Sequence, residues 1–197
     1  MNAALVGQAT IIGHDKAIKD SDLARGLAAG DPNAFAEAYD RYAASLYRTL
    51  KTLLLSSADA EDALQEVFVG IATSRNARIR DLRAYLFVAA RNEAFRVLRR
   101  RKRESPLSEH ALDESYFLEG SADKTLAPDR QTQYHDWAGL LARLPLEQRE
   151  IIALKVWEEM TFVEIARIVR VSPNTVMSRY RYGIERLRLW CKEEECS

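Results

Sequence analysis

The sequence is poor in the residue types that carry catalysis, metal binding or covalent cross-links. Its 197 residues include only two cysteines, Cys191 and Cys196, and three histidines. Two cysteines cannot form a disulfide framework, and this pair has neither the spacing of a zinc site nor a histidine near it, so we interpret both as reduced thiols. The sequence contains no phosphate-binding glycine loop, nucleophile elbow or metal-spaced cluster, so we expect no cofactor, no metal and no enzymatic activity.

Long apolar runs and strand signals are also missing. No stretch approaches the roughly 18 apolar residues of a membrane span, and residues 1–13 lack the basic start of a signal peptide. We therefore expect a cytoplasmic protein without membrane insertion, with residues 1–19 as a disordered N-terminal extension. Glycine and proline number only eight and five. Helical periodicity dominates the rest, which predicts an all-α fold.

The first half of the chain predicts one compact helical bundle. A short helix is expected over residues 22–29, ending at Gly30, and Asp31 then caps a long helix that begins at Pro32. A third helix follows Ser56 or Ser57, and a fourth begins near residue 82. The apolar face of the long helix, on which we interpret the tyrosines as core residues, consists of Phe35, Tyr39, Tyr42, Leu46, Leu50 and Leu53, with Tyr47 beside it.

The net charge of zero hides a strong segregation of charge along the chain. Residues 75–103 contain eleven Arg or Lys against two acids, residues 104–136 are mainly acidic, and residues 167–188 are basic again. Two basic regions joined by an acidic connector predict two separate contacts with DNA. Within the connector, residues 105–129 include Pro106, Gly120 and scattered serines, which predict a flexible linker with a short helical turn at residues 111–118.

The last third of the chain predicts a second small helical domain that contains a helix-turn-helix. Helices are expected over residues 130–143, 146–157, 161–169 and 173–193. Thr161 and Glu164 have the spacing of a capping box. Residues 170–172 form the turn, Ser172 caps the next helix and Pro173 takes its first position. Val176 and Tyr180 are expected to point inward.

The outward side of that last helix has the chemistry of a DNA-reading surface. Asn and Arg side chains can read adenine and guanine in the major groove, and a helix N-terminus with hydroxyl side chains can bind phosphate. A plain bundle with solvated arginines is the alternative, and the agreement of capping, spacing and exposed chemistry disfavours it. The predicted upstream contacts are Ser172, Asn174, Thr175, Ser178, Arg179, Arg181 and Arg186.

Two segments carry a resemblance to a known family. DAEDALQEVF (residues 59–68) and TFVEIA with VSPNTVMSRYRY (residues 161–182) resemble the extracytoplasmic-function sigma factors of bacteria, and the likeness covers roughly residues 20–103 and 130–193. It implies a region 2 domain over residues 20–104, a linker over residues 105–129 and a region 4 domain over residues 130–197. It also implies promoter-specific initiation of transcription.

The resemblance implies partners and roles for particular residues. The partners would be promoter DNA, the clamp helices of the largest subunit of core RNA polymerase, and an anti-sigma factor of unknown identity. The protein would be associated with the nucleoid when bound to polymerase. The polymerase-binding residues would be Asp59, Glu61, Asp62, Gln65 and Glu66. The residues that bind and melt the downstream promoter element would be Arg78, Arg80, Arg83, Arg91, Asn92, Arg96, Arg99 and Arg100.

The sequence departs from the family pattern at four positions. Tyr85 replaces a common Trp, Arg96 replaces a frequent acid, Arg170 replaces a turn glycine, and Met177 replaces a common Lys. A left-handed Arg170 costs about 1 kcal/mol, and the loss of a Lys removes one phosphate contact. These departures leave the base preference open.

Two other functions remain as alternatives. A DNA-binding response regulator can share a similar helix-turn-helix, but its receiver domain would alternate strands and helices. A sigma-like adaptor that binds polymerase or a regulator without initiating transcription is hardly separated from an initiation factor by sequence. The function of the basic segment distinguishes the two.

Overall fold

The computed structural model describes residues 18–73, 79–104 and 137–195, and these residues contain helices and no strand. The all-α prediction is confirmed. Residue 78, the linker turn at residues 111–118 and Cys196 lie outside the described residues. The helices are α1 (Asp20–Ala29), α2 (Pro32–Leu54), α3 (Ser57–Thr73), α4 (Leu82–Glu104), α5 (Trp137–Ala142), α6 (Leu146–Val156), α7 (Phe162–Val169) and α8 (Pro173–Glu195).

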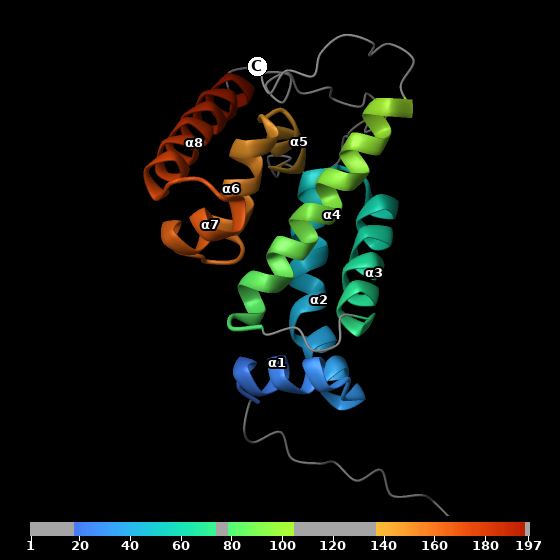
Figure 1. The fold of residues 1–197 in the computed structure, drawn as a ribbon. Helices are drawn as coiled ribbons and strands as arrows, with labels where there is room; N and C mark the ends of the chain where they lie inside the picture. The colour runs from blue at the N-terminus through green and yellow to red at the C-terminus, as the bar shows by residue number, and fades with distance from the viewer. Residues whose placement is uncertain (1–17, 74–78, 105–136, 196–197) are drawn as a thin grey trace, which may run out of the picture.

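The first domain consists of α1 to α4. Figure 1 shows α2, α3 and α4 side by side, with α1 across one end. Gly30 ends α1 in the left-handed region at φ 76°, and the Asp31 side chain then accepts a hydrogen bond from Asn33 N, as the capping prediction required. Helix α1 begins at Asp20, slightly earlier than predicted, because the carbonyl of Lys19 accepts from the first turn.

The core of this domain lies between α2, α3 and α4. Leu46 and Leu50 of α2 are completely buried, and so are Ala60 of α3 and Leu86 of α4. The prediction that Tyr39 is a core residue is wrong in part, since 45% of this residue is exposed. Its ring packs on the edge of the core, 4.8 Å from the ring of Phe68, while its remaining surface faces outward.

The second domain consists of α5 to α8 and contains the predicted helix-turn-helix. Thr161 and Glu164 form both hydrogen bonds of the capping box at the start of α7. Arg170 ends α7 with φ 59° and ψ 42°, the left-handed conformation that the replacement of a turn glycine predicted. Val176 is completely buried and Tyr180 is half-buried, so the inward side of α8 is also as predicted.

The carboxyl end of α2 is held by arginines from both domains. The last carbonyls of a helix have no partner within it. Arg101 of α4 donates to the carbonyl of Leu54, and Arg149 of α6 donates to the carbonyl of Leu53 at 3.3 Å. Both guanidinium groups also lie at the negative end of the helix dipole, which favours positive charge there.

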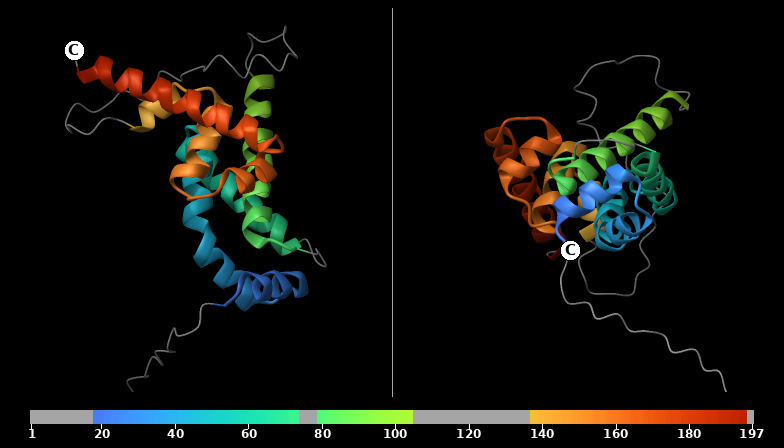
Figure 2. Two further views of the ribbon diagram at one scale, coloured as in Figure 1. Left: turned by 90° about the vertical axis from the view of Figure 1, so that its left-hand side faces the viewer. Right: turned by 60° about the horizontal axis from the view of Figure 1, so that its bottom comes forward.

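The two domains share one apolar core in this structure. A single cluster of buried residues continues from Leu53 and Phe87 of the first domain to Leu146, Ile151 and Ile165 of the second. Helix α6 contacts α2, and α7 contacts α4. The further views in Figure 2 show the second domain packed along one side of the α2–α4 bundle. The sequence predicted two small domains, and the structure adds that they are closely packed together.

Gly26 is required where α1 crosses α2. A Cβ at this position would be 2.5 Å from the Cβ of Ala34, which cannot move without shifting the helix. We expect Gly26→Ala to lower the free energy of unfolding by about 1–3 kcal/mol, measured by urea denaturation. Gly70→Ala is the matched control, since nothing lies within 4 Å of its added Cβ, and we expect it to stabilise α3 by about 0.5–1 kcal/mol. Equal effects of the two substitutions would contradict the close helix crossing.

Candidate nucleic-acid and protein interfaces

The first turns of α8 present small polar side chains to solvent. Ser172 caps the helix, because its Oγ accepts a hydrogen bond from Thr175 N at 3.1 Å and lies 2.8 Å from the hydroxyl oxygen of Thr175. Asn174 and Ser178 are exposed one turn apart. An exposed helix N-terminus with these groups can donate to phosphate and to base edges.

The arginines of α8 differ in their exposure and in whether they form ion pairs. Arg181 and Arg186 are exposed, and the guanidinium of Arg181 lies over the ring of Tyr182, 5.2 Å from its centroid. Arg179 is 2.7 Å from the carboxylate of Glu147 on α6 and is only 30% exposed in its side chain. Arg181 and Arg186 are therefore available for DNA in this arrangement, and Arg179 is engaged within its own domain.

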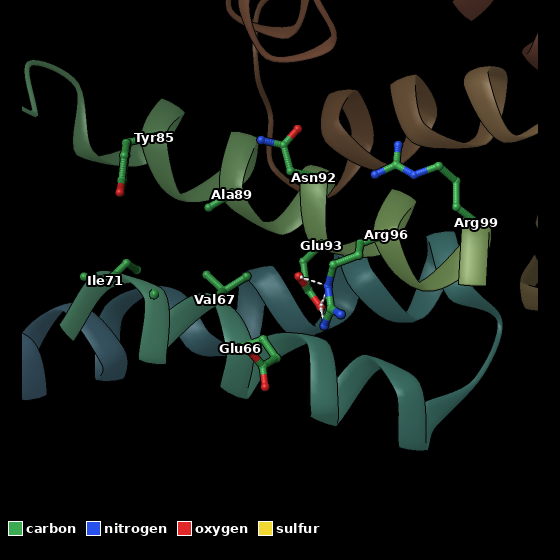
Figure 3. A pocket seen from close by; sticks show the side chains of 10 residues that line it. Glu66, Val67, Ile71, Tyr85, Ala89, Asn92, Glu93, Arg96 and Arg99 are labelled. Atoms are coloured by element: carbon green, nitrogen blue, oxygen red, sulfur yellow. Dashed lines mark hydrogen bonds and ion pairs between the residues drawn. The ribbon is translucent and has the colours of Figure 1, made fainter. Parts of the chain in front are cut away.

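A groove of about 380 Å³ lies between α3 and α4. Its floor includes Val67 and Ile71 of α3, and in Figure 3 the side chain of Tyr85 points from α4 toward α3 whereas that of Asn92 points away from α3. The lining of the groove thus combines apolar side chains with polar and charged ones, including Arg96 and Arg99 of α4. The groove is lined by Glu66, Val67, Gly70, Ile71, Tyr85, Ala89, Asn92, Glu93, Arg96 and Arg99.

Arg96 is held by a neighbouring carboxylate in this groove. Its Nε and Nη2 atoms contact the two oxygens of Glu93 at 2.5 to 3.0 Å (Figure 3). The hydrogen bonds to Glu93 raise the pKa of Arg96 further above its ordinary value. The positive charge of Arg96 is therefore already paired with the carboxylate of Glu93. Asn92, Arg99 and Arg100 of the same helix are exposed.

Two other arginines of α4 are turned toward the second domain. Arg83 donates a hydrogen bond to the backbone carbonyl of Glu158, and Arg91 Nε lies 2.8 Å from Glu150 Oε1. The sequence placed both side chains with the DNA contacts, and in this structure they contact protein. Arg80 is exposed at the start of α4.

Glu150 is the most deeply buried carboxylate among the described residues, with 3% of the residue exposed. Burial raises the pKa of Glu150 to about 7, and the positive charge of Arg91 opposes that rise. Burial likewise lowers the pKa of Arg149 to about 10, which leaves the guanidinium charged at neutral pH.

The outward face of α3 is acidic. Glu61, Asp62, Gln65 and Glu66 are all exposed there, and Val69 adds an apolar side chain that is 56% exposed. Asp59 differs from the other predicted residues, because it forms an ion pair with Arg101 and its side chain is only 24% exposed. Four of the five predicted acidic or amide side chains are thus available to a partner, and the fifth helps to hold α4 against α3.

Neither a membrane-spanning helix nor a metal site is found among the described residues. No helix within residues 18–73, 79–104 and 137–195 is long and apolar enough to span a membrane. In the same residues no group of three or more His, Cys, Asp or Glu side chains is arranged to hold a metal ion.

The comparison with known families decides the identity. Residues 38–104 match the family described as sigma-70 region 2, and residues 136–187 match sigma-70 region 4. The chain belongs to the extracytoplasmic-function sigma factors. It is therefore a sigma factor of transcription initiation.

Curated relatives and solved structures agree with this assignment. The chain is 27% identical over 173 residues to the sigma factor SigK of Mycobacterium sp. strain KMS, covering 84% of this chain and 87% of the relative. It is 28% identical to SigW of Bacillus subtilis, covering 81% and 89%. CnrH in complex with the cytosolic domain of CnrY has the same fold, with a TM-score of 0.64, 20% identity and coverage of 90% of this chain and 99% of that one. RpoE in complex with the anti-sigma factor NepR from Bartonella quintana has a TM-score of 0.63 at 24% identity, covering 80% and 96%.

Sequence reasoning missed residues of this sigma factor that contact both domains. Arg48, Arg149 and Glu158 hold the domains together, and Arg101 fixes the end of α4. The run of arginines at residues 99–103 signalled positive charge, but periodicity gave no sign of which member faces inward. Nothing in the sequence distinguished Glu150 or Glu158 from a solvated acid.

Glu150 gives the stability of the sigma factor a specific pH dependence. A carboxyl whose pKa is higher in the folded chain than in the unfolded one binds its proton more tightly when folded, so stability falls as the pH rises. This contribution is complete below the ordinary value of 4.5 and is lost as the pH passes about 7, which corresponds to about 3 kcal/mol. The charged groups that act on Glu150 are Arg91, Glu147 and Arg179.

The measurement is urea denaturation at about pH 5 and pH 8, for the wild-type chain and for Glu150→Gln. We expect the wild type to lose more stability over this interval than the variant does. An equal loss in both proteins would show that Glu150 does not bind a proton in this range.

Proposed function

We propose that this sigma factor binds core RNA polymerase through α3, recognises an upstream promoter element through α8, and binds and melts a downstream element through α4 and the segment before it. In this proposal the sigma factor catalyses no reaction itself. It is associated with the nucleoid when it is bound to polymerase. The observation that supports this proposal is the separation of three exposed surfaces of different chemistry on three helices of one chain.

The polymerase contact is assigned to the acidic face of α3. Glu61, Asp62, Gln65 and Glu66 are exposed there, and Val69 extends the face with an apolar side chain. Carboxylates that meet a basic partner surface increase the rate and the specificity of association. Asp59 supports the contact indirectly, because it holds Arg101 and so fixes α4 against α3.

The downstream contact is assigned to α4 and the segment before it. Melting a duplex requires positive charge that follows the strand and surfaces that hold unstacked bases. Arg80, Arg99 and Arg100 supply exposed positive charge. Asn92 and Tyr85 border a groove whose floor is apolar. Arg83, Arg91 and Arg96 are predicted contacts that would first have to leave protein partners, and Arg78 lies outside the described residues.

The upstream contact is assigned to the N-terminal half of α8. Asn174, Ser178 and Arg181 project from one side of the helix and are exposed. Ser172 and Thr175 lie at the helix N-terminus, where phosphate binding is favourable. Arg186 lies farther along the helix, where it can contact the backbone of the duplex, and Arg179 is available only when it leaves Glu147.

An inhibitory protein partner is a further part of the proposal. The structural neighbours CnrH and RpoE were solved with the cytosolic domain of CnrY and with the anti-sigma factor NepR, respectively. By analogy we assign an anti-sigma factor to this chain as well.

Charge reversal on α3 tests the polymerase contact. We expect Asp62→Lys with Glu66→Lys to weaken binding to core polymerase about tenfold or more, because like charges then meet across the interface. The measurement is a titration of labelled sigma factor with purified core enzyme. The control is Asp22→Lys with Asp40→Lys, which changes the net charge equally on α1 and α2, where both side chains are exposed. Unchanged affinity in the α3 variant would reject the assignment.

In-vitro transcription with core polymerase on fragmented genomic DNA tests the function as a whole. We expect sharp start sites that share two spaced motifs, and Asn174→Ala should relax base preference in the upstream motif alone, at a cost of about 1–3 kcal/mol. Arg186→Ala should weaken all promoters to a similar degree, as the loss of a phosphate contact does. A chain that binds polymerase and yields no start sites would instead be an adaptor.

A further inference from the structure

A second groove between α3 and α4 adjoins the groove drawn in Figure 3. Its volume is about 170 Å³, and it shares Glu66, Glu93 and Arg96 with the larger groove. On the α3 side it is lined by residues that were predicted to bind polymerase, and on the α4 side by arginines that were predicted to bind DNA. These residues are Asp59, Asp62, Gln65 and Glu66 of α3, and Arg96 and Arg100 of α4. The groove therefore makes the acidic face of α3 continuous with one side of α4.

Arg96 lies on the side of α4 that faces α3. In Figure 3 its guanidinium lies beside the carboxylate of Glu93, between the two helices. The side chains of Asn92 and Arg99 point away from α3 in the same view. The residues of α4 that were predicted to bind DNA thus point in two directions, and Arg96 points toward the polymerase-binding helix.

Carboxylates of two helices surround Arg96. The side chain of Glu93 is only 15% exposed, and its two oxygens accept hydrogen bonds from Nε and Nη2 of Arg96. These bonds contribute most to the raised pKa of Arg96, and the negative charge of Glu66 on α3 raises the pKa further. A DNA phosphate at Arg96 would have to lie near both carboxylates, and the repulsion of like charges disfavours that position. A neutral carbonyl oxygen meets no such repulsion.

The ion pair leaves hydrogen-bond donors of Arg96 free for a partner. A guanidinium has five N–H groups, and the contacts with Glu93 use only those on Nε and Nη2. The side chain is 53% exposed, so the two N–H groups of Nη1 can reach another molecule. Because Glu93 already fixes the guanidinium, Arg96 loses little side-chain entropy when a partner binds.

We propose that Arg96, held by Glu93, belongs to the polymerase contact and donates from Nη1 to a carbonyl oxygen of core polymerase. The acids of α3 meet basic groups around that oxygen. The identity of the partner rests on the proposed function, and the continuity of the groove with the acidic face of α3 is what connects Arg96 to it. Arg96 then extends the polymerase surface onto α4, while Asn92 and Arg99 remain with the downstream DNA surface.

Titration of the labelled full chain with purified core enzyme, without DNA, tests this contact. Arg96→Met keeps the aliphatic part of the side chain and removes its charge and its donors. We expect core affinity to fall about tenfold, as for the loss of a hydrogen bond from a charged donor. Loss of a positive charge beside a basic partner would by itself strengthen binding. Weaker binding therefore cannot come from charge alone.

Arg25→Met is the matched control for core affinity. Arg25 is an exposed arginine of α1 that is also paired with an acid three residues earlier, Asp22, at 3.0 Å. Its replacement removes the same charge and the same kind of ion pair far from α3 in the sequence. We expect unchanged core affinity in Arg25→Met, with equal helix content by circular dichroism in all proteins. An equal loss of affinity in both variants would contradict a specific role of Arg96.

The salt dependence of promoter binding separates the polymerase contact from a DNA contact. Holoenzyme is formed at saturating core enzyme, and promoter affinity is measured over a range of salt concentrations. Loss of one phosphate contact lowers the slope of log affinity against log salt by about one. We expect this change in Arg99→Met and no change of slope in Arg96→Met. A lower slope in Arg96→Met, or unchanged core affinity in that variant, would overturn the assignment of Arg96 to polymerase.

The charge reversal on α3 separates failure of this assignment from failure of the proposed function. If Asp62→Lys with Glu66→Lys leaves core affinity unchanged, the whole polymerase contact on α3 is rejected. If that reversal weakens core binding and Arg96→Met does not, the contact on α3 stands and only the role of Arg96 is rejected.

Discussion

The arrangement of the whole molecule depends on the carboxyl end of α2. Leu53 is buried in the shared core, and its carbonyl accepts from Arg149 of α6, while the next carbonyl accepts from Arg101 of α4. The unpaired carbonyls and the negative dipole at this helix end thus attract one arginine from each domain. This single helix end sets the position of α4 against α3, through Asp59, and of α6 against α2.

The functional surfaces follow from that arrangement. Helix α3 is covered on its inner side and free on its outer side, so its acids remain available. Helix α4 packs against α2 and α3 of its own domain and against α7 of the second domain, so its arginines divide into exposed and engaged groups. Helix α8 packs on α6 so closely that a Cβ at Gly183 would be 2.7 Å from Ile152 Cδ1, which leaves the opposite side of α8 to solvent. Each binding surface is the side of a helix that packing left uncovered.

The features that could be predicted from the sequence are those that depend on a few neighbouring residues. The caps at Asp31 and Thr161 and the left-handed turn at Arg170 could be read directly, because each depends on residues within one turn. The exposed position of Tyr39 could not be predicted, because helical periodicity gives the buried side of a helix but not where the edge of the core lies. The engagement of Arg83 could not be predicted either, because periodicity does not tell which other domain covers the remaining side of the helix. The sequence signal for Arg80 and Arg83 was the same, and only tertiary packing separates them.

The ion pair between Arg91 and Glu150 has an evolutionary consequence. A substitution at position 150 leaves Arg91 of α4 without its carboxylate partner, although Glu150 itself is buried in the other domain. A change at either position would therefore favour a compensating change at the other. Among relatives that share this arrangement of the two domains, positions 91 and 150 are expected to covary, and a comparison of sequences would place that signal across the two domains rather than within one.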